Sequence, residues 1–440
     1  MSTAATAAAL AFAAATLMLP LAAAAPPAGV VATIRHKSQL WRDGDPADGV
    51  CAAAGCAGAR CSQDVSGCYC SCGYAMYGGP QLAVTKAGTL LSVVEGRKHK
   101  WDEGDEGAGQ AKAWHDILLK RSTDSGRTWS NATIVYSESG GWGSAAGNAN
   151  STIGNSEVVV DQHTGEIFIF MCRNNSNVLL TSSTDDARTF AAAKDVSAQV
   201  KPDSLGWGWY ATTFSSLQIR HHPKYKGRLV ACADHVVGQW KAYPITNGHS
   251  HTILSDTHGS SWRVGKTPLA LPSSNECSLA ELANGTIVMN ARNYLDAKDG
   301  TQPCKAPCKV HRYIAHSHDG GESFEVGWFA QDLPDPIVFS DMTATADGRT
   351  LLLTHPPSES ARRNVSLFAS GDGGASWSLA AQLEHGPSQY SSIAMLPDGS
   401  AAIQVDSGCQ SNANPQSPAC DKTSPQQEDF FLVSLGSSGR

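Results

Sequence analysis

The chain has 440 residues, 17% of them charged, and its 33 basic and 40 acidic side chains leave a net charge of −7. Such a balance argues against a nucleic-acid partner, because binding to phosphates depends on clustered cations. With 41% hydrophobic residues the chain is also too apolar for general disorder. Its 13 cysteines favour an oxidising compartment over the cytosol.

The N-terminus supports that compartment. Residues 1–25 carry no charged side chain and end in four alanines before Pro26 and Pro27. We predict a signal peptide over 1–25, although its start lacks the usual basic residue and an uncleaved anchor is the alternative. The mature chain is then expected to have no membrane span and to be secreted, or delivered to the endomembrane lumen or a lysosome-like compartment. Five Asn-x-Ser/Thr triplets add modest support for glycosylation, and they start at Asn131, Asn150, Asn174, Asn284 and Asn364.

Six cysteines fall within the short stretch from Cys51 to Cys72, whose other residues are mainly Ala, Gly and Ser. Such a segment cannot bury a core, so we predict that residues 26–73 form an N-terminal strand and a disulfide-rich insertion. Six cysteines allow 15 pairings, and the connectivity cannot be read from the sequence. A metal cluster is the less favoured alternative, because no histidine lies in the stretch.

The other seven cysteines have two kinds of surroundings. Those that flank short polar loops are predicted to staple them, and those within apolar runs are predicted to be buried thiols. The predicted staples join Cys304 to Cys308 and Cys409 to Cys420, and the predicted buried thiols are Cys172, Cys232 and Cys277.

Beyond Tyr74 the chain consists of short apolar runs separated by turn residues, with no sustained helical periodicity. The clearest runs occupy residues 89–94, 166–171, 228–233, 286–290 and 350–354, and most follow a turn such as Ala-Asn-Gly or Ala-Asp-Gly. Alternating strands and tight turns are typical of β-hairpins. The sequence therefore predicts an all-β protein.

A repeated motif, Ser-x-Asp-x-Gly-x-x-Trp, sets the predicted architecture. It is intact at 122–129 and 370–377, ends in Phe at 317–324, lacks the glycine at 183–190 and lacks the aspartate at 255–262. The Ser and Asp side chains suit a hairpin turn, where Gly supplies a positive φ. Because the copies lie roughly 60 residues apart, about six repeats fill residues 74–440, which predicts a six-bladed β-propeller.

These motifs are similar to the Asp boxes of the exo-α-sialidase (neuraminidase) family. Longer stretches carry the resemblance further, from about residue 74 to about residue 406: they are 90–97, which ends in Glu-Gly-Arg, 209–212, 275–293, 362–365 and 390–392. The resemblance implies a retaining exo-sialidase that removes terminal α-linked sialic acids from glycoproteins, glycolipids such as gangliosides, or oligosaccharides. It also implies a monomer whose chemistry needs no metal and no cofactor.

The resemblance assigns a role to each predicted site residue. Sialic acid carries a carboxylate on its anomeric carbon, and Arg292 and Arg362 are expected to clamp it with their planar guanidinium groups. A carboxylate nucleophile would be repelled there, so the neutral phenol of Tyr390 is expected to attack, with Glu276 as its base.

The acid that protonates the leaving sugar is expected in the loop that follows Arg97. Asp102 matches by its spacing from Arg97, and Asp105 is the alternative in this acid-rich loop. Arg97 is expected to contact the substrate or to orient the loop.

One departure from the family pattern affects the clamp. Gly78 stands where the family has its first clamp arginine, and Asp406 stands in place of a late glutamate. Three explanations remain open. An arginine of the N-terminal segment (Arg35, Arg42 or Arg60) takes the vacant place; the enzyme is weak or acts on a different ulosonic acid; or the propeller is an inactive, lectin-like binder of sialic acid. The histidines show no spacing typical of a zinc site, so no metal residue is predicted.

Overall fold

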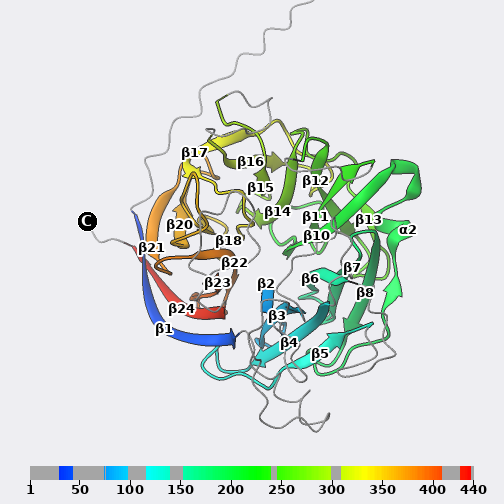
Figure 1. The fold of residues 1–440 in the computed structure, drawn as a ribbon, viewed down its shortest axis with the longest axis horizontal. Coiled ribbons are helices and arrows are strands. Elements are labelled where there is room, and N and C mark those ends of the chain that lie inside the picture. The colour runs from blue at the N-terminus through cyan, green and yellow to red at the C-terminus, as the bar shows by residue number, and fades with distance from the viewer. Residues whose placement is uncertain are drawn as a thin grey trace, which may run out of the picture.

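The computed structural model describes residues 29–42, 74, 76–97, 115–138, 152–238, 245–298, 309–408 and 427–437. Six four-stranded antiparallel sheets are arranged in a ring (Figure 1), which confirms the predicted six-bladed β-propeller. The predicted signal peptide, the cysteine-rich stretch and the two loop staples lie outside the described residues. Among those residues, no helix is both long and apolar enough to cross a membrane.

Each of the first five blades is built from four consecutive strands. The first contains β2 (Met76–Val84), β3 (Leu90–Arg97), β4 (His115–Ser122) and β5 (Thr133–Tyr136). The second contains β6 (Ile153–Val160), β7 (Ile167–Arg173), β8 (Asn177–Ser183) and β9 (Lys194–Asp195), and the third β10 (Trp207–Gln218), β11 (Leu229–Val237), β12 (Gly248–Ser255) and β13 (Arg263–Val264). The fourth contains β14 (Ser274–Glu281), β15 (Ile287–Asn293), β16 (His311–Ser317) and β17 (Trp328–Pro334), and the fifth β18 (Met342–Ala344), β19 (Leu351–His355), β20 (Ser366–Ser370) and β21 (Ser378–Gln382). Two short helices, α2 (Ser197–Val200) and η2 (Asp203–Leu205), precede β10. The five apolar runs predicted from the sequence become the second strands of these blades.

The sixth blade joins the two ends of the chain. It contains β22 (Ser388–Met395), β23 (Ala401–Ser407), β24 (Gln427–Ser437) and β1 (Val30–Arg42), and β1 pairs antiparallel with β24 (Figure 1). Residues 30–42, predicted to belong to a separate N-terminal segment, are therefore the outer strand of the propeller. The pairing covers the free edge of β24, which would otherwise be open to another strand.

A ring of hydrogen bonds links the inner strands β2, β6, β10, β14, β18 and β22. In each blade one buried polar side chain, in the inner strand or directly before it, bonds to the backbone of the next inner strand or of the residues just before that strand. Ser278 Oγ donates to Ser340 O at 2.9 Å. In the other five bonds a backbone N–H donates to a side-chain oxygen: Val158 N to Gln81 (2.7 Å), Thr213 N to Glu157 (3.2 Å), Leu279 N to Ser215 (3.1 Å), Ile393 N to Asp341 (3.0 Å) and Leu82 N to Ser392 (3.0 Å). Because the last bond returns to the first blade, the ring is closed and the inner strands are fixed relative to one another.

The Asp boxes lie in the hairpins between the third and fourth strands of the first five blades. In the first box Ser122 Oγ accepts from Gly126 N at 2.8 Å, and Asp124 accepts from Thr128 N at 2.8 Å. The copy without glycine keeps the geometry, because Ala187 adopts the left-handed φ of 60° in place of that glycine. The boxes therefore serve as folding turns, at the opposite end of the blades from the starts of the inner strands.

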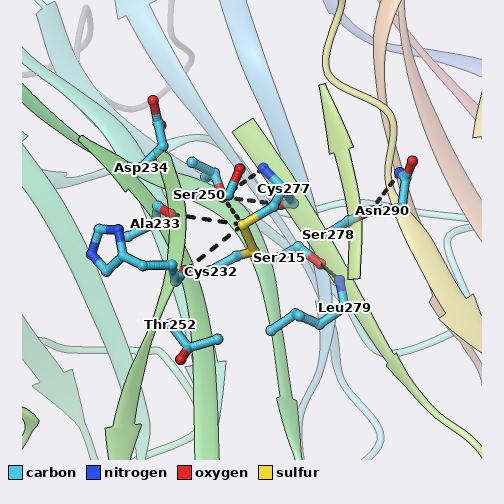
Figure 2. The surroundings of a disulfide bond; sticks show 12 residues. Ser215, Cys232, Ala233, Asp234, Ser250, Thr252, Cys277, Ser278, Leu279 and Asn290 are labelled. Atoms are coloured by element: carbon cyan, nitrogen blue, oxygen red, sulfur yellow. Dashed lines mark hydrogen bonds between the residues drawn. A yellow bond between two sulfur atoms is a disulfide. The ribbon is translucent and has the colours of Figure 1, made fainter. Parts of the chain in front are cut away.

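One cysteine prediction is wrong. Cys232 on β11 and Cys277 on β14 are both buried, as expected, but they form a disulfide between the third and fourth blades, with Cα atoms 5.8 Å apart (Figure 2). Their pairing depends on β11 and β14 lying side by side, which the apolar surroundings of each cysteine do not reveal. Cys172 is buried at the end of β7.

Candidate active site

Three predicted site residues, Glu276, Arg292 and Tyr390, lie in contact with one another. Glu276 and Tyr390 are near the starts of the inner strands β14 and β22, and Arg292 is near the end of β15, the strand next to β14. The phenol of Tyr390 on β22 donates a hydrogen bond to Glu276 Oε1 on β14 at 2.5 Å. Arg292, at the end of β15, donates from Nη1 to Tyr390 Oη at 2.9 Å and forms an ion pair with Glu276 Oε2. A phenol is a weak nucleophile unless a base accepts its proton. This arrangement supplies both the base and an adjacent cation.

Irregular strand pairing aims these side chains into the site. The register of β14 shifts between Ser274 and Cys277, and that of β22 shifts between Ser388 and Ser391. Glu276 and Tyr390 lie inside these two irregularities, where the ladder is interrupted and a side chain can be redirected. Similar shifts near the starts of β2, β6 and β10 show that this end of the ring is irregular in most blades.

A second cation lies against the ring of Tyr390. The guanidinium carbon of Arg362 is 5.7 Å from the ring centroid, and its nitrogens donate to Gln389 Oε1 at 3.1 Å and to the Ile337 carbonyl at 2.7 Å. Gln389 in turn donates to Asp406 at 2.9 Å. Asp406 therefore supports Arg362 through Gln389, a residue that the sequence argument missed although it precedes Tyr390. Two arginines thus flank the tyrosine, an arrangement that suits a carboxylate ligand.

Aromatic packing holds the tyrosine ring. Phe214 meets Tyr390 edge-on, with centroids 6.1 Å apart, and Phe339 lies 5.9 Å away on a tilted plane. Such contacts favour one ring orientation. Phe214 adopts a positive φ of 63° within the irregular part of β10.

Arg97 occupies the space beside Gly78. A Cβ atom built on Gly78 would lie 3.6 Å from the Arg97 guanidinium carbon. The guanidinium donates to Glu95 Oε2 from Nε at 3.0 Å and from Nη2 at 2.7 Å, and Glu95 is paired with Gly78 across β2 and β3. Arg97 is therefore the cation that lies where the predicted clamp lacks an arginine.

The proposed N-terminal substitutes lie elsewhere or cannot be placed. Arg35 and Arg42 are on β1, the outer strand of the sixth blade, where Arg35 donates to Ser434 Oγ at 2.8 Å. Arg60 lies outside the described residues, as do Asp102 and Asp105. The predicted acid therefore stays a prediction, in a loop whose flanking residues, Arg97 and His115, are paired across β3 and β4.

A buried acid that the sequence argument missed lies close to the site. Asp234 on β11 accepts a hydrogen bond from the side chain of Asn275 at 2.5 Å. Burial raises the pKa of Asp234 well above its usual range, nearby Glu276 raises it further, and Arg292 opposes the rise. Asp234 is thus a buried neighbour of the Glu276–Arg292 pair, and its surroundings favour the neutral form. An isolated aspartate inside an apolar run carried no signal of this role.

The histidines near this blade form a neutral cluster. His235 stacks on Trp207 with ring centroids 3.6 Å apart, and its Nδ1 is 3.1 Å from that of His251. Burial lowers the pKa of His251 to about 3 and also lowers that of His235. Within the described ranges, no group of three or more His, Cys, Asp or Glu side chains is arranged to hold a metal ion.

The chain resembles known proteins over most of its length. A model of the BNR repeat-like domain matches residues 101–403. The chain is 28% identical over 370 residues to a sialidase from Micromonospora viridifaciens, covering 76% of this chain and 50% of that protein. It is 24% identical over 362 residues to a sialidase from Bacteroides fragilis, covering 74% and 59%. The chain therefore spans between half and three fifths of these two curated relatives.

Solved structures share its fold. The Hadza microbial sialidase Hz136 superposes with a TM-score of 0.63 at 21% identity, covering 82% of this chain and 66% of that one. The sialidase of Trypanosoma rangeli superposes with a TM-score of 0.61 at 14% identity, covering 91% and 60%. Six four-stranded blades with Asp-box turns, and a tyrosine that contacts two arginines, define the class of protein as an Asp-box β-propeller. The match to the BNR repeat-like domain covers more than half of the chain, so the chain belongs to the family of proteins with this domain.

Proposed function

We propose that the protein is a retaining exo-α-sialidase, a glycoside hydrolase that releases terminal α-linked sialic acids from sialylated glycoconjugates. The observation that carries this proposal is the contact of Tyr390 with both Glu276 and Arg292. The sialidases among its curated relatives support the same activity.

The proposed clamp addresses the charge of the substrate. A carboxylate on the anomeric carbon accepts paired N–H bonds from planar guanidinium groups. Arg292 contacts the phenol oxygen of Tyr390, and Arg362 lies over its ring. Arg97 is buried, with 6% of the residue exposed, and is the candidate for the third cation of the clamp. Charge-assisted bonds in such a sheltered site are stronger than neutral ones.

The proposed reaction has two steps. In the first, Glu276 takes the proton of Tyr390, the phenolate oxygen bonds to the anomeric carbon, and Asp102 protonates the leaving glycosidic oxygen. In the second, Asp102 accepts a proton from water, the hydroxide displaces the tyrosine, and the phenol regains its proton from Glu276. Two displacements at one carbon retain its configuration.

The second candidate is a sialic-acid-binding, lectin-like propeller without catalysis. Gly78 favours it, because one arginine fewer than the family pattern weakens the clamp. Retention of Tyr390, Glu276 and their hydrogen bond favours the enzyme. Binding without turnover separates the two.

The deciding experiment measures release of 4-methylumbelliferone from its sialic acid glycoside, for the wild type and for Tyr390→Phe. We expect turnover in the wild type and its loss in the variant, whereas Tyr225→Phe, on the opposite end of the blades, keeps wild-type rates. A 2,3-difluorosialic acid should also leave a covalent mass on the peptide that contains Tyr390. A complex of the Trypanosoma rangeli sialidase with that compound is described as the covalent intermediate. Folded wild-type protein that binds sialic acid but releases no product would establish the lectin instead.

A further inference from the structure

The residues on both sides of Glu276 are attached to the preceding blade. Asn275 donates from its side chain to Asp234. Cys277 is joined to Cys232 by the disulfide (Figure 2). Both partners belong to β11 and are two positions apart, so their side chains leave the same face of that strand.

Further bonds from the same blade hold this segment. Ser250 N on β12 donates to Ser274 Oγ at 2.9 Å, and Ser250 Oγ donates to the Asn275 carbonyl. Thr213 Oγ1 on β10 donates to the Cys277 carbonyl at 2.9 Å. All four residues from Ser274 to Cys277 are buried. Glu276 differs from its neighbours because its carboxylate reaches across to Tyr390 in the sixth blade.

The strand itself does not fix Glu276. Ser274 pairs with Asn293 and Cys277 pairs with Ala291, so the two residues between them oppose a single position of β15. The regular β ladder is interrupted there, as in a bulge. Side-chain bonds to the third blade therefore take over the positioning that strand pairing provides elsewhere.

We propose that Asp234 and the Cys232–Cys277 disulfide are positioning elements for Glu276, which anchor the backbone on either side of it to the third blade and so keep its carboxylate between Tyr390 and Arg292. This inference rests on the proposed sialidase function. Its physical basis is that a base must lie within hydrogen-bond reach of the proton it takes, and a displacement of about 1 Å can cost on the order of 100-fold in rate.

The state of Asp234 suits this role. Its Oδ2 accepts the Asn275 bond, and its buried Oδ1 has no hydrogen-bond partner among the residues that the structure describes. Burial raises the pKa of Asp234 and so favours its neutral form. An asparagine at this position keeps an oxygen in the place of Oδ2, so it should accept the same hydrogen bond from Asn275.

The first test compares Asp234→Asn with Asp234→Ala. The asparagine keeps an oxygen that accepts from Asn275, so kcat should stay within about 3-fold of wild type, while the alanine should lower kcat by roughly 10- to 100-fold with KM within about 2-fold. A purely structural role would instead lower the active fraction of both variants in proportion to their loss of stability. Equal kcat values for alanine and wild type, or no rescue by asparagine, would overturn the role of Asp234.

The second test needs no substrate. Amide hydrogen exchange of the peptide that contains residues 274–277 is compared between wild type and Cys232→Ser/Cys277→Ser, with Cys172→Ser as the control for loss of a buried sulfur. We expect faster exchange of this peptide in the double variant and no change there in the control. Unchanged exchange in the double variant would refute the anchor. If the double variant does not fold, the same measurement on Asp234→Ala decides by the same criterion.

The two proposals fail in different ways. Absence of turnover in the wild type would refute the sialidase function and leave the exchange measurement valid. Turnover with unchanged exchange and unchanged kcat in the anchor variants would refute only the positioning role.

Discussion

The stability of the propeller should depend on pH through a carboxyl group in its inner ring. Asp341, directly before β18, is buried and accepts hydrogen bonds from Ile393 N at 3.0 Å, Ser392 Oγ at 2.9 Å and Met342 N at 2.9 Å. Burial outweighs these bonds and raises the pKa of Asp341 from 3.8 to about 6. The folded protein therefore holds this proton more tightly than the unfolded chain does.

The size of the effect follows from the shift in pKa. A rise of about two units corresponds to roughly 3 kcal/mol of differential stability. Because the folded-state pKa is the higher one, this contribution is fully present below about pH 4 and is lost as the pH rises through about 6. Glu157, the other carboxyl of the ring, acts in the same direction, since burial also raises its pKa. The ring should therefore be more stable in mild acid than at neutral pH.

The assay is urea unfolding followed by tryptophan fluorescence at several pH values from 4.5 to 7.5, for wild type and Asp341→Asn. The asparagine keeps an oxygen for the Ile393 N–H and does not ionise, so its unfolding free energy should fall less than that of wild type over this range. The matched control is Asp347→Asn, an exposed aspartate in the β18–β19 hairpin. The reasoning is refuted if wild type and Asp341→Asn lose the same free energy of unfolding between the two ends of the range.

Three further predictions concern the site. Glu276→Gln should lower kcat by at least about 100-fold with a small change in KM, because the amide cannot take the proton of Tyr390. Steady-state kinetics with the fluorogenic sialic acid glycoside measure both constants. A raised KM with unchanged kcat would contradict the role of Glu276 as the base. Arg362→Ala should raise KM by roughly 10- to 150-fold, which corresponds to the roughly 1.5–3 kcal/mol of a charged hydrogen bond. A KM within about 2-fold of wild type in the same kinetic assay would exclude Arg362 from the clamp. Arg97→Ala should weaken sialic acid binding, and adding Gly78→Arg to that variant should restore it. Gly78→Arg alone should have little effect, because Arg97 already lies beside that position. Calorimetry with sialic acid measures these affinities, and a large gain in affinity from Gly78→Arg alone would show that no cation fills the position.

Much of the architecture could be predicted because its signals are local. Each Asp box is a contiguous turn whose Ser, Asp and Gly contact one another within a few residues, so the motif and its spacing indicate the blades. The contiguous stretches around Glu276 and Tyr390 likewise indicated the residues that meet in the site. Even the degraded box at Ala187 retains its turn, because neighbouring contacts hold the backbone.

Contacts between blades left no such signal. The outer strand β1 of the sixth blade pairs with β24 from the other end of the chain, and no hairpin or Asp box joins them. Cys232 and Cys277 are 45 positions apart, and Arg97 reaches Gly78 only through the pairing of β2 with β3. The turns and repeated motifs of the chain thus predicted the all-β propeller, and its longer motifs predicted the residues that meet at Tyr390. Only the tertiary structure decided the closure of the ring, the anchor beside Glu276 and the cation beside Gly78. These contacts join residues that are far apart in the chain or on different strands, so neither the neighbouring residues nor the spacing of motifs predicts them.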